Sequence, residues 1–181
     1  MLCALLLASA LASVPPTSPP TATAAPADAK NTTATTTFRG VDDKTYGPLI
    51  QQAHAGKIVV VNFWASYCQP CLVEIPDLLA IADKHKADVD VVFVGTDDPN
   101  EKDHAASILK RRRIALPATS SFIVTNADPR PFISRVDASW QGEMPTTVIY
   151  DRTGKKLELL VAAHSAAEFE AAIARAQAAA K

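Results

Sequence analysis

The sequence contains little cysteine and almost no net charge. Only 3 of its 181 residues are cysteines, and two of them, Cys68 and Cys71, stand three positions apart. A chain with one close pair is not a disulfide-stapled scaffold. Apolar residues make up 48% of the chain, so we expect one globular domain with room for an end segment. The net charge of −1 gives no overall electrostatic argument for a nucleic acid or an anionic membrane as partner. A basic run at residues 110–113, KRRR, is expected to be a solvated helix end.

The N-terminal segment lacks the length of a membrane span. Residues 1–14, MLCALLLASALASV, are apolar and small, but too few to cross a bilayer comfortably. They are typical of a secretory signal, although no Lys or Arg precedes the apolar run, and Cys3 is interpreted as part of it. We therefore expect a leader at residues 1–13, a Pro/Thr/Ala-rich linker at 14–37 and a folded domain at 38–181. The protein would be periplasmic or otherwise exported, either free or held at a membrane by an uncleaved leader.

Hydrophobic patterns predict strands and helices in alternation. Strands are expected at residues 36–41, 57–64, 89–95, 120–125, 146–151 and 155–161, and helices at 47–54, 68–86, 98–113, 130–136 and 166–179. Pro76 is expected to kink the second helix. The order predicts an α/β fold in which a parallel core is followed by an antiparallel hairpin with a helix packed on it.

The cysteine pair lies between a strand-like run and a helix-like run. Thiol–disulfide exchange needs a thiolate that attacks and a second thiol that resolves the mixed disulfide. Cys68 would stand at the helix N-terminus, where unpaired N–H groups stabilise a negative sulfur, and Cys71 would lie one turn further on. Pro70 fits the first turn because it has no N–H to lose. We predict that Cys68 is the attacking residue and Cys71 the resolving residue.

A metal-binding or haem-binding role for the pair has less support. A structural zinc site normally needs four ligands, and no second C-x-x-C exists. A c-type haem site needs His directly after the second cysteine, where this chain has Leu72. A purely structural disulfide remains an alternative. The four histidines are scattered: His54, His85, His104 and His164.

Two stretches resemble a known family. The segments VVVNFWASYCQPCLVEIPDL, residues 59–78, and GEMPTTVIYDRTGK, residues 142–155, are similar to thioredoxin-fold proteins, above all to the exported disulfide reductases of the TlpA/ResA group. The resemblance implies a central mixed sheet flanked by helices, with an insertion before the C-terminal β-hairpin. Asn62 replaces the buried Asp that thioredoxins usually carry. Tyr67 stands where Trp is the common choice.

The same resemblance assigns roles to further residues. Glu74 completes the pattern C-x-x-C-x-x-E-x-P, and in the exported group this Glu lies near the buried cysteine. We expect it to exchange protons with Cys71, because a carboxyl in a partly apolar site tends to have a raised pKa. Met144 and Pro145 match the cis-proline loop that pairs with an extended substrate. Trp64, Gln69 and Pro70 are further candidates for substrate contact, although core packing is an equal alternative for Trp64.

The expected function is reduction of disulfides in client proteins through Cys68 and Cys71. By resemblance, the clients are apocytochrome c or copper-site assembly proteins, and the electrons come from a membrane thiol donor. No cofactor beyond the Cys68–Cys71 disulfide, no metal, no nucleic acid and a monomeric state are expected. Two alternatives stay open: an exported thiol oxidant or isomerase, and a copper-binding module in which His164 would add a ligand.

Overall fold

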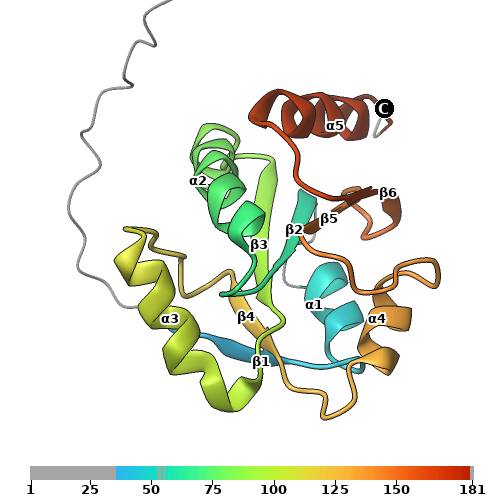
Figure 1. The fold of residues 1–181 in the computed structure, drawn as a ribbon. Helices are drawn as coiled ribbons and strands as arrows, with labels where there is room; N and C mark the ends of the chain where they lie inside the picture. Colours follow the sequence, from blue (N-terminus) through green and yellow to red (C-terminus); the bar gives the residue numbers. More distant parts are fainter. Residues whose placement is uncertain (1–35, 53, 55, 180–181) are drawn as a thin grey trace, which may run out of the picture. The chain divides into compact units, whose positions relative to one another are not determined.

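The described domain is built around one six-stranded sheet (Figure 1). The structure, a computed structural model, describes residues 36–52, 54 and 56–179. The predicted leader and nearly all of the predicted linker lie outside the described residues. Among the described residues, no helix is long and apolar enough to cross a membrane.

The sheet is mixed, as predicted. Its order is β1 (Arg39–Val41), β4 (Ser121–Val124), β3 (Val89–Gly95), β2 (Ile58–Trp64), β5 (Thr146–Tyr150) and β6 (Lys156–Val161). The first four strands in this order pair in parallel, and β5 and β6 join as antiparallel strands. β2 is buried along its whole length and β3 almost so, which suits their β-branched apolar sequences IVVVNFW and VDVVFVG.

Helices cover both faces of the sheet (Figure 1). Residues of α2 (Gln69–Lys84), α3 (Lys102–Arg111) and α5 (Ala166–Ala179) share one core cluster. Residues of α1 (Tyr46–Gln52) and α4 (Arg130–Val136) share the other. Alternate positions of β2 serve the two clusters: Ile58, Val60 and Trp64 on one side, and Val59, Val61 and Phe63 on the other. Asn62 therefore points toward the α2 side.

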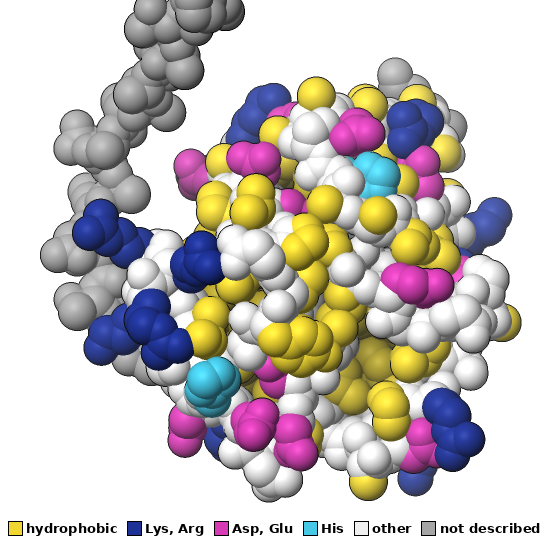
Figure 2. All heavy atoms as spheres, in the orientation of Figure 1, with side chains coloured by type: hydrophobic (Ala, Val, Ile, Leu, Met, Phe, Trp, Pro, Cys, Tyr) yellow, Lys and Arg dark blue, Asp and Glu magenta, His cyan; other side chains and the backbone are white. Residues whose placement is uncertain are grey.

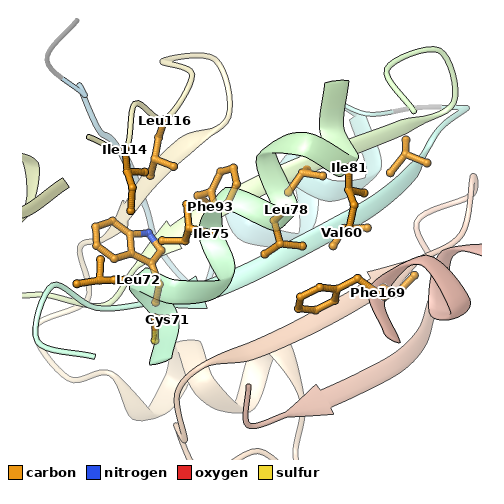
Figure 3. Packing of buried hydrophobic residues seen from close by; sticks show 14 of the residues in the cluster. Val60, Cys71, Leu72, Ile75, Leu78, Ile81, Phe93, Ile114, Leu116 and Phe169 are labelled. Atoms are coloured by element: carbon orange, nitrogen blue, oxygen red, sulfur yellow. The ribbon is translucent and has the colours of Figure 1, made fainter. Parts of the chain in front are cut away.

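The α2 side of the core continues beneath the cysteine pair. Leu72, Ile75 and Leu78 follow Cys71 along one face of α2 and pack with Val60 and Phe93 of the sheet (Figure 3). Ile75 and Leu78 are fully buried. The start of α2 is thus fixed rigidly on β2, because the same helical face that carries Cys71 carries the core residues.

Most predicted elements agree with the structure, and two differ clearly at their ends. The strand predicted from residue 36 begins at Arg39. The helix predicted at 98–113 is a 3-10 turn, η1 (Pro99–Glu101), followed by α3. Pro76 lies within the bounds of α2, and the kink expected there stays a prediction.

Candidate active site

The cysteine pair stands where β2 ends and α2 begins. Cys68 is the N-cap of α2, with extended backbone, and its Sγ accepts a hydrogen bond from the Cys71 N–H at 3.3 Å. The two residues form a disulfide with a Cα–Cα distance of 5.3 Å. Pro70 occupies the first turn, where a helix has no partner for an N–H group. The predicted placement of the pair is confirmed.

The two cysteines differ in access to solvent. Cys68 keeps 8% of its surface exposed and Cys71 keeps none. Gln69 and Pro70 between them are exposed, and Tyr67 is 73% exposed. Cys71 instead faces the core beside Leu72 and Ile75 (Figure 3). A partner protein can therefore approach this pair only from the Cys68 side.

Glu74 is buried and held by a polar network one turn after Cys71. It is 3% exposed. The Asn62 Nδ2 donates to Glu74 Oε1 at 2.7 Å and to Thr147 Oγ1 at 3.0 Å, and the His164 N–H donates to Glu74 Oε2 at 3.2 Å. β2, β5 and the loop before α5 each contribute one member of this network. Glu74 is thus not a solvated helix residue.

Burial raises the pKa of the Glu74 carboxyl, because removal from water penalises the charged form. The donors Asn62 and His164 oppose this effect by stabilising the carboxylate. Asn62 Oδ1 is itself buried and has no hydrogen-bond partner among the described residues. The side chain at position 62 therefore acts on Glu74 only as a donor in this arrangement. Cys71 and Glu74 lie on one face of α2, which suits proton exchange between a thiol and a carboxyl.

The loop that presents Cys68 is fixed by Asp97, which sequence reasoning missed. Asp97 follows β3 and is 6% exposed. Its carboxylate accepts hydrogen bonds from the Ser66 N–H at 3.1 and 3.0 Å and from Ser66 Oγ at 2.6 Å. Ser66 and Asp97 are separated by 31 residues. No local pattern around Asp97 could have indicated the contact, since it depends on the parallel pairing of β2 with β3.

The loop before β5 lies against the same end of the sheet. The Met144–Pro145 peptide bond is cis, as the resemblance implied. Thr96 links this loop to the end of β2: its N–H donates to the Trp64 carbonyl at 2.9 Å and its Oγ1 to Met144 Sδ at 2.7 Å. The Pro145 carbonyl accepts from the Ala162 N–H at 3.0 Å. Pro145 is buried and Met144 is half-buried.

The structure corrects the prediction that Trp64 contacts a substrate. Its side chain is fully buried and packs against Phe38, with ring centroids 6.1 Å apart. It therefore belongs to the core beneath the site, and no part of it is available to a client. Gln69 is exposed, and its Oε1 accepts a hydrogen bond from Arg112 Nη2 at 2.6 Å.

A cavity of about 670 Å³ opens beside the motif. Tyr67 and Met144 line it, so it borders both the Cys68 loop and the cis-proline loop. Further lining residues include Asp97, Asn126, Phe132 and Trp140. This hollow offers a mixed apolar and polar surface next to Cys68.

The comparisons with known proteins agree with this geometry. The family model described as Redoxin matches residues 29–173, which is more than half of the chain. The chain belongs to the Redoxin family. Together with the sheet order and the covering helices, this confirms the predicted thioredoxin-like fold, and it is consistent with the resemblance to the TlpA/ResA group. Family membership and the close cysteine pair both support thiol–disulfide oxidoreductase activity.

Individual relatives point in the same direction. A thiol:disulfide interchange protein, HelX of Rhodobacter capsulatus, is 62% identical over 26 residues, which cover 14% of this chain and only 15% of that relative. A crystal structure of a putative thiol:disulfide interchange protein DsbE from Chlorobium tepidum has 29% identity and a TM-score of 0.53, covering 68% of this chain and 82% of that one. A DsbF homologue from Corynebacterium diphtheriae has 21% identity and a TM-score of 0.57, covering 68% and 74%, and shares the fold.

Metal ligands are not gathered in the described part of the chain. There, no group of three or more His, Cys, Asp and Glu side chains could hold a metal ion. His164 does lie near the site, since its N–H binds Glu74, but its imidazole packs edge-on against Phe169, with ring centroids 6.0 Å apart. Its Nδ1 is 3.6 Å from Glu168 Oε1.

Proposed function

We propose that this protein is an exported thiol–disulfide oxidoreductase that reduces disulfides in client proteins. One observation carries the proposal: Cys68 caps the helix and keeps access to solvent, while its disulfide partner Cys71 is fully enclosed. This asymmetry suits a reaction in which one sulfur meets the client and the other completes the exchange.

The reaction balances in two steps. In the reduced protein, the Cys68 thiolate attacks one sulfur of the client disulfide. A Cys68–client disulfide forms, the client S–S bond breaks, and the second client sulfur leaves as a thiolate that takes up a proton. The Cys71 thiolate then attacks Cys68 Sγ, so that the Cys68–Cys71 disulfide forms and the remaining client thiol is released. Two electrons pass to the client, and an external dithiol must restore them to this protein.

Glu74 is proposed as the group that takes the Cys71 proton before the second step. A buried carboxyl with a raised pKa is closer in proton affinity to a thiol than an exposed carboxyl is. Asn62 and the His164 N–H keep the carboxylate hydrogen-bonded until it takes up that proton.

The cavity between Tyr67 and Met144 is proposed to receive an extended client segment. Both residues line it, and they belong to the two loops that flank Cys68 and Pro145. A segment seated there would bring its disulfide to the exposed side of Cys68. Gln69 and Pro70, also exposed, would border the segment on the helix side.

The reducing direction, the compartment and the clients rest on the leader-like sequence and on the resemblance. An apolar segment at residues 1–14 is typical of a secretory signal. Clients would be apocytochrome c or copper-site assembly proteins, and a membrane thiol protein would supply the electrons.

Trapping of the mixed disulfide tests the function. In the native cell, Cys71→Ser should accumulate covalent adducts that dithiothreitol reduces, because the attack survives and the release does not. Cys68→Ser should give none. Cys3→Ser is the matched control, since it removes the remaining cysteine of the chain, and it should behave as wild type. Adducts formed only by Cys68→Ser would contradict the assigned roles.

The direction of electron flow is measured separately. Equilibration with thiol buffers should give a reduction potential near that of reducing members of the fold, about −270 mV for thioredoxin, and not near the value of about −120 mV of a strong oxidant. A value at the oxidising end would support the exported oxidant in place of the reductase.

A further inference from the structure

A dense group of cations ends α3. Lys110, Arg111, Arg112 and Arg113, here called the basic run, are all exposed. Figure 2 shows Lys and Arg side chains gathered over the region where α3 lies in Figure 1. No described carboxylate forms an ion pair with any of the four, whereas several, though not all, of the cations elsewhere in the described domain pair with acidic side chains, as Lys84 does with Glu170. The basic run therefore carries charge that the described fold leaves uncompensated.

One member of the run touches the redox motif. Arg112 Nη2 donates to Gln69 Oε1 at 2.6 Å, and Gln69 stands between the two cysteines. The segment after the run is anchored next to this point. Ile114 and Leu116 are buried in the same cluster as Leu72 (Figure 3). The guanidinium of Arg112 is thus held beside the motif by both its own hydrogen bond and the anchored chain behind it.

Arg113 has a left-handed backbone conformation that is unusual for an arginine. Arg113 has φ 59°, its N–H donates to the Lys110 carbonyl, and the Ile114 N–H donates to the Leu109 carbonyl. This is a Schellman helix end, whose left-handed position usually carries glycine. Favourable interaction with the helix dipole accounts for Lys110 and Arg111 in the last turn, but not for an arginine in the left-handed position. This chain therefore carries a cation at a position where local geometry favours glycine.

We propose that the basic run is a docking surface for an acidic segment that flanks the reactive cysteine of a partner protein, an inference that rests on the proposed function. Carboxylates next to the partner's sulfur would pair with Arg112 and Arg113 while that sulfur reaches Cys68. Charge complementarity at the rim of an interface accelerates encounter and rejects partners of like charge. A protein partner is favoured over a lipid surface because the contact between Arg112 and Gln69 places the charge at the motif that meets protein thiols.

The test compares probes that differ only in charge. Three peptide disulfides of the same length carry Glu, Gln or Lys on both sides of the cysteine, and each oxidises the reduced full-length protein. The second-order rate constants are measured at low ionic strength and again at about 1 M salt, where the Debye length falls to about 3 Å. At low salt, the Glu probe should react roughly tenfold faster than the Lys probe, and the ratio should approach one at high salt.

Two double variants assign this ratio to the basic run. Arg112→Gln with Arg113→Gln should bring the ratio close to one. The matched control, Lys86→Gln with Lys155→Gln, removes the same charge at the opposite end of the sheet and should keep the wild-type ratio. Lys86 and Lys155 are both exposed and adjoin strand ends remote from Trp64.

Four outcomes overturn the inference. If all probes exchange and the Glu and Lys probes have rate constants in a ratio near one, the docking role is refuted. The same holds if the ratio is unchanged by the Arg112 and Arg113 substitutions. Neither result contradicts the proposed oxidoreductase function. Absence of exchange with every probe refutes the proposed function and the docking role with it. Binding to vesicles that contain phosphatidylglycerol, lost in the arginine variant, together with a ratio near one, would assign the basic run to an anionic membrane surface instead.

Discussion

Replacement of Glu74 by glutamine separates the effect of a buried charge from the effect of shape. Glu74 is 3% exposed, and burial raises the pKa of its carboxyl. An acid whose pKa is raised on folding stabilises the fold fully below its unfolded-state pKa, about 4.3, and loses that contribution as the pH rises through the folded-state value. The charged form is thus the unfavourable one in the native protein. Glu74→Gln removes the charge at every pH and keeps the size of the side chain.

The magnitude follows from two opposing contributions. At acid pH both side chains are neutral, and glutamine is expected to cost about 1 kcal/mol, because the donors Asn62 and His164 then face an amide instead of a carboxyl. Rotation of the Asn62 amide would reduce this cost, since its Oδ1 has no described partner and could accept from the new amide. As the pH rises, the wild type loses about 1.4 kcal/mol for every tenfold increase in proton affinity that folding imposes on Glu74. The free energy of unfolding of the variant therefore rises relative to that of the wild type.

The assay is urea unfolding of the disulfide form at pH 4 to 8, a range that spans the carboxyl reference value of about 4.3. The disulfide form is chosen because its cysteines do not titrate. The quantity compared is the difference in unfolding free energy between variant and wild type at each pH. It should be most unfavourable to Glu74→Gln near pH 4 and should move in the variant's favour toward pH 8.

Glu170→Gln is the control of opposite sign. Its side-chain hydrogen bond with Lys84 lowers the pKa of Glu170, so the carboxylate stabilises the fold above its unfolded-state pKa and loses this effect as the pH falls. The side chain of Glu170 is 30% exposed, so the expected loss near pH 7 is below about 1 kcal/mol. If the Glu74→Gln difference were the same at both ends of the pH range while Glu170→Gln behaved as stated, burial would not perturb Glu74 and its proposed exchange of protons with Cys71 would lose its basis.

Substitutions at three further positions test, by urea unfolding, the residues that support the site. Asp97→Asn should cost about 1–3 kcal/mol, since an amide cannot accept all the hydrogen bonds from Ser66. The alkylation rate of reduced Cys68 should change as well, because the loop that presents this residue loosens. Unchanged stability and an unchanged alkylation rate would show that Asp97 does not support the loop. Arg113→Gly should stabilise the fold by about 0.5–1 kcal/mol because the position has a positive φ. Arg113→Ala is the control and should not stabilise the fold. Equal effects of the two substitutions would show that the gain does not come from the backbone. Leu78→Ala should cost about 2–5 kcal/mol because the side chain is fully buried under α2, and a loss below about 1 kcal/mol would contradict the packing.

Local pattern predicted much of the architecture. The strand at Val89–Gly95 and the helices at Arg130–Val136 and Ala166–Ala179 have the predicted bounds. These segments are long or strongly patterned, and their ends carry local signals such as the reciprocal hydrogen bonds of Ser165 and Glu168. The first strand and the 98–113 segment differed at their ends, where such signals are weak.

Sequence spacing by itself determined that Cys68 and Cys71 stand at the junction of a buried strand and a helix, because a strand, a turn and a helix start are properties of neighbouring residues. It could not determine which polar groups surround them. Asn62 meets Thr147 and Glu74 meets His164 only because β5 and the loop before α5 fold back onto β2, and Asp97 meets Ser66 only because β3 pairs with β2. Tertiary packing also decided that Trp64 is buried and that Arg112 donates a hydrogen bond to Gln69. Burial and the pKa of a carboxyl depend on everything packed around it, and those neighbours are supplied by segments far apart in the chain.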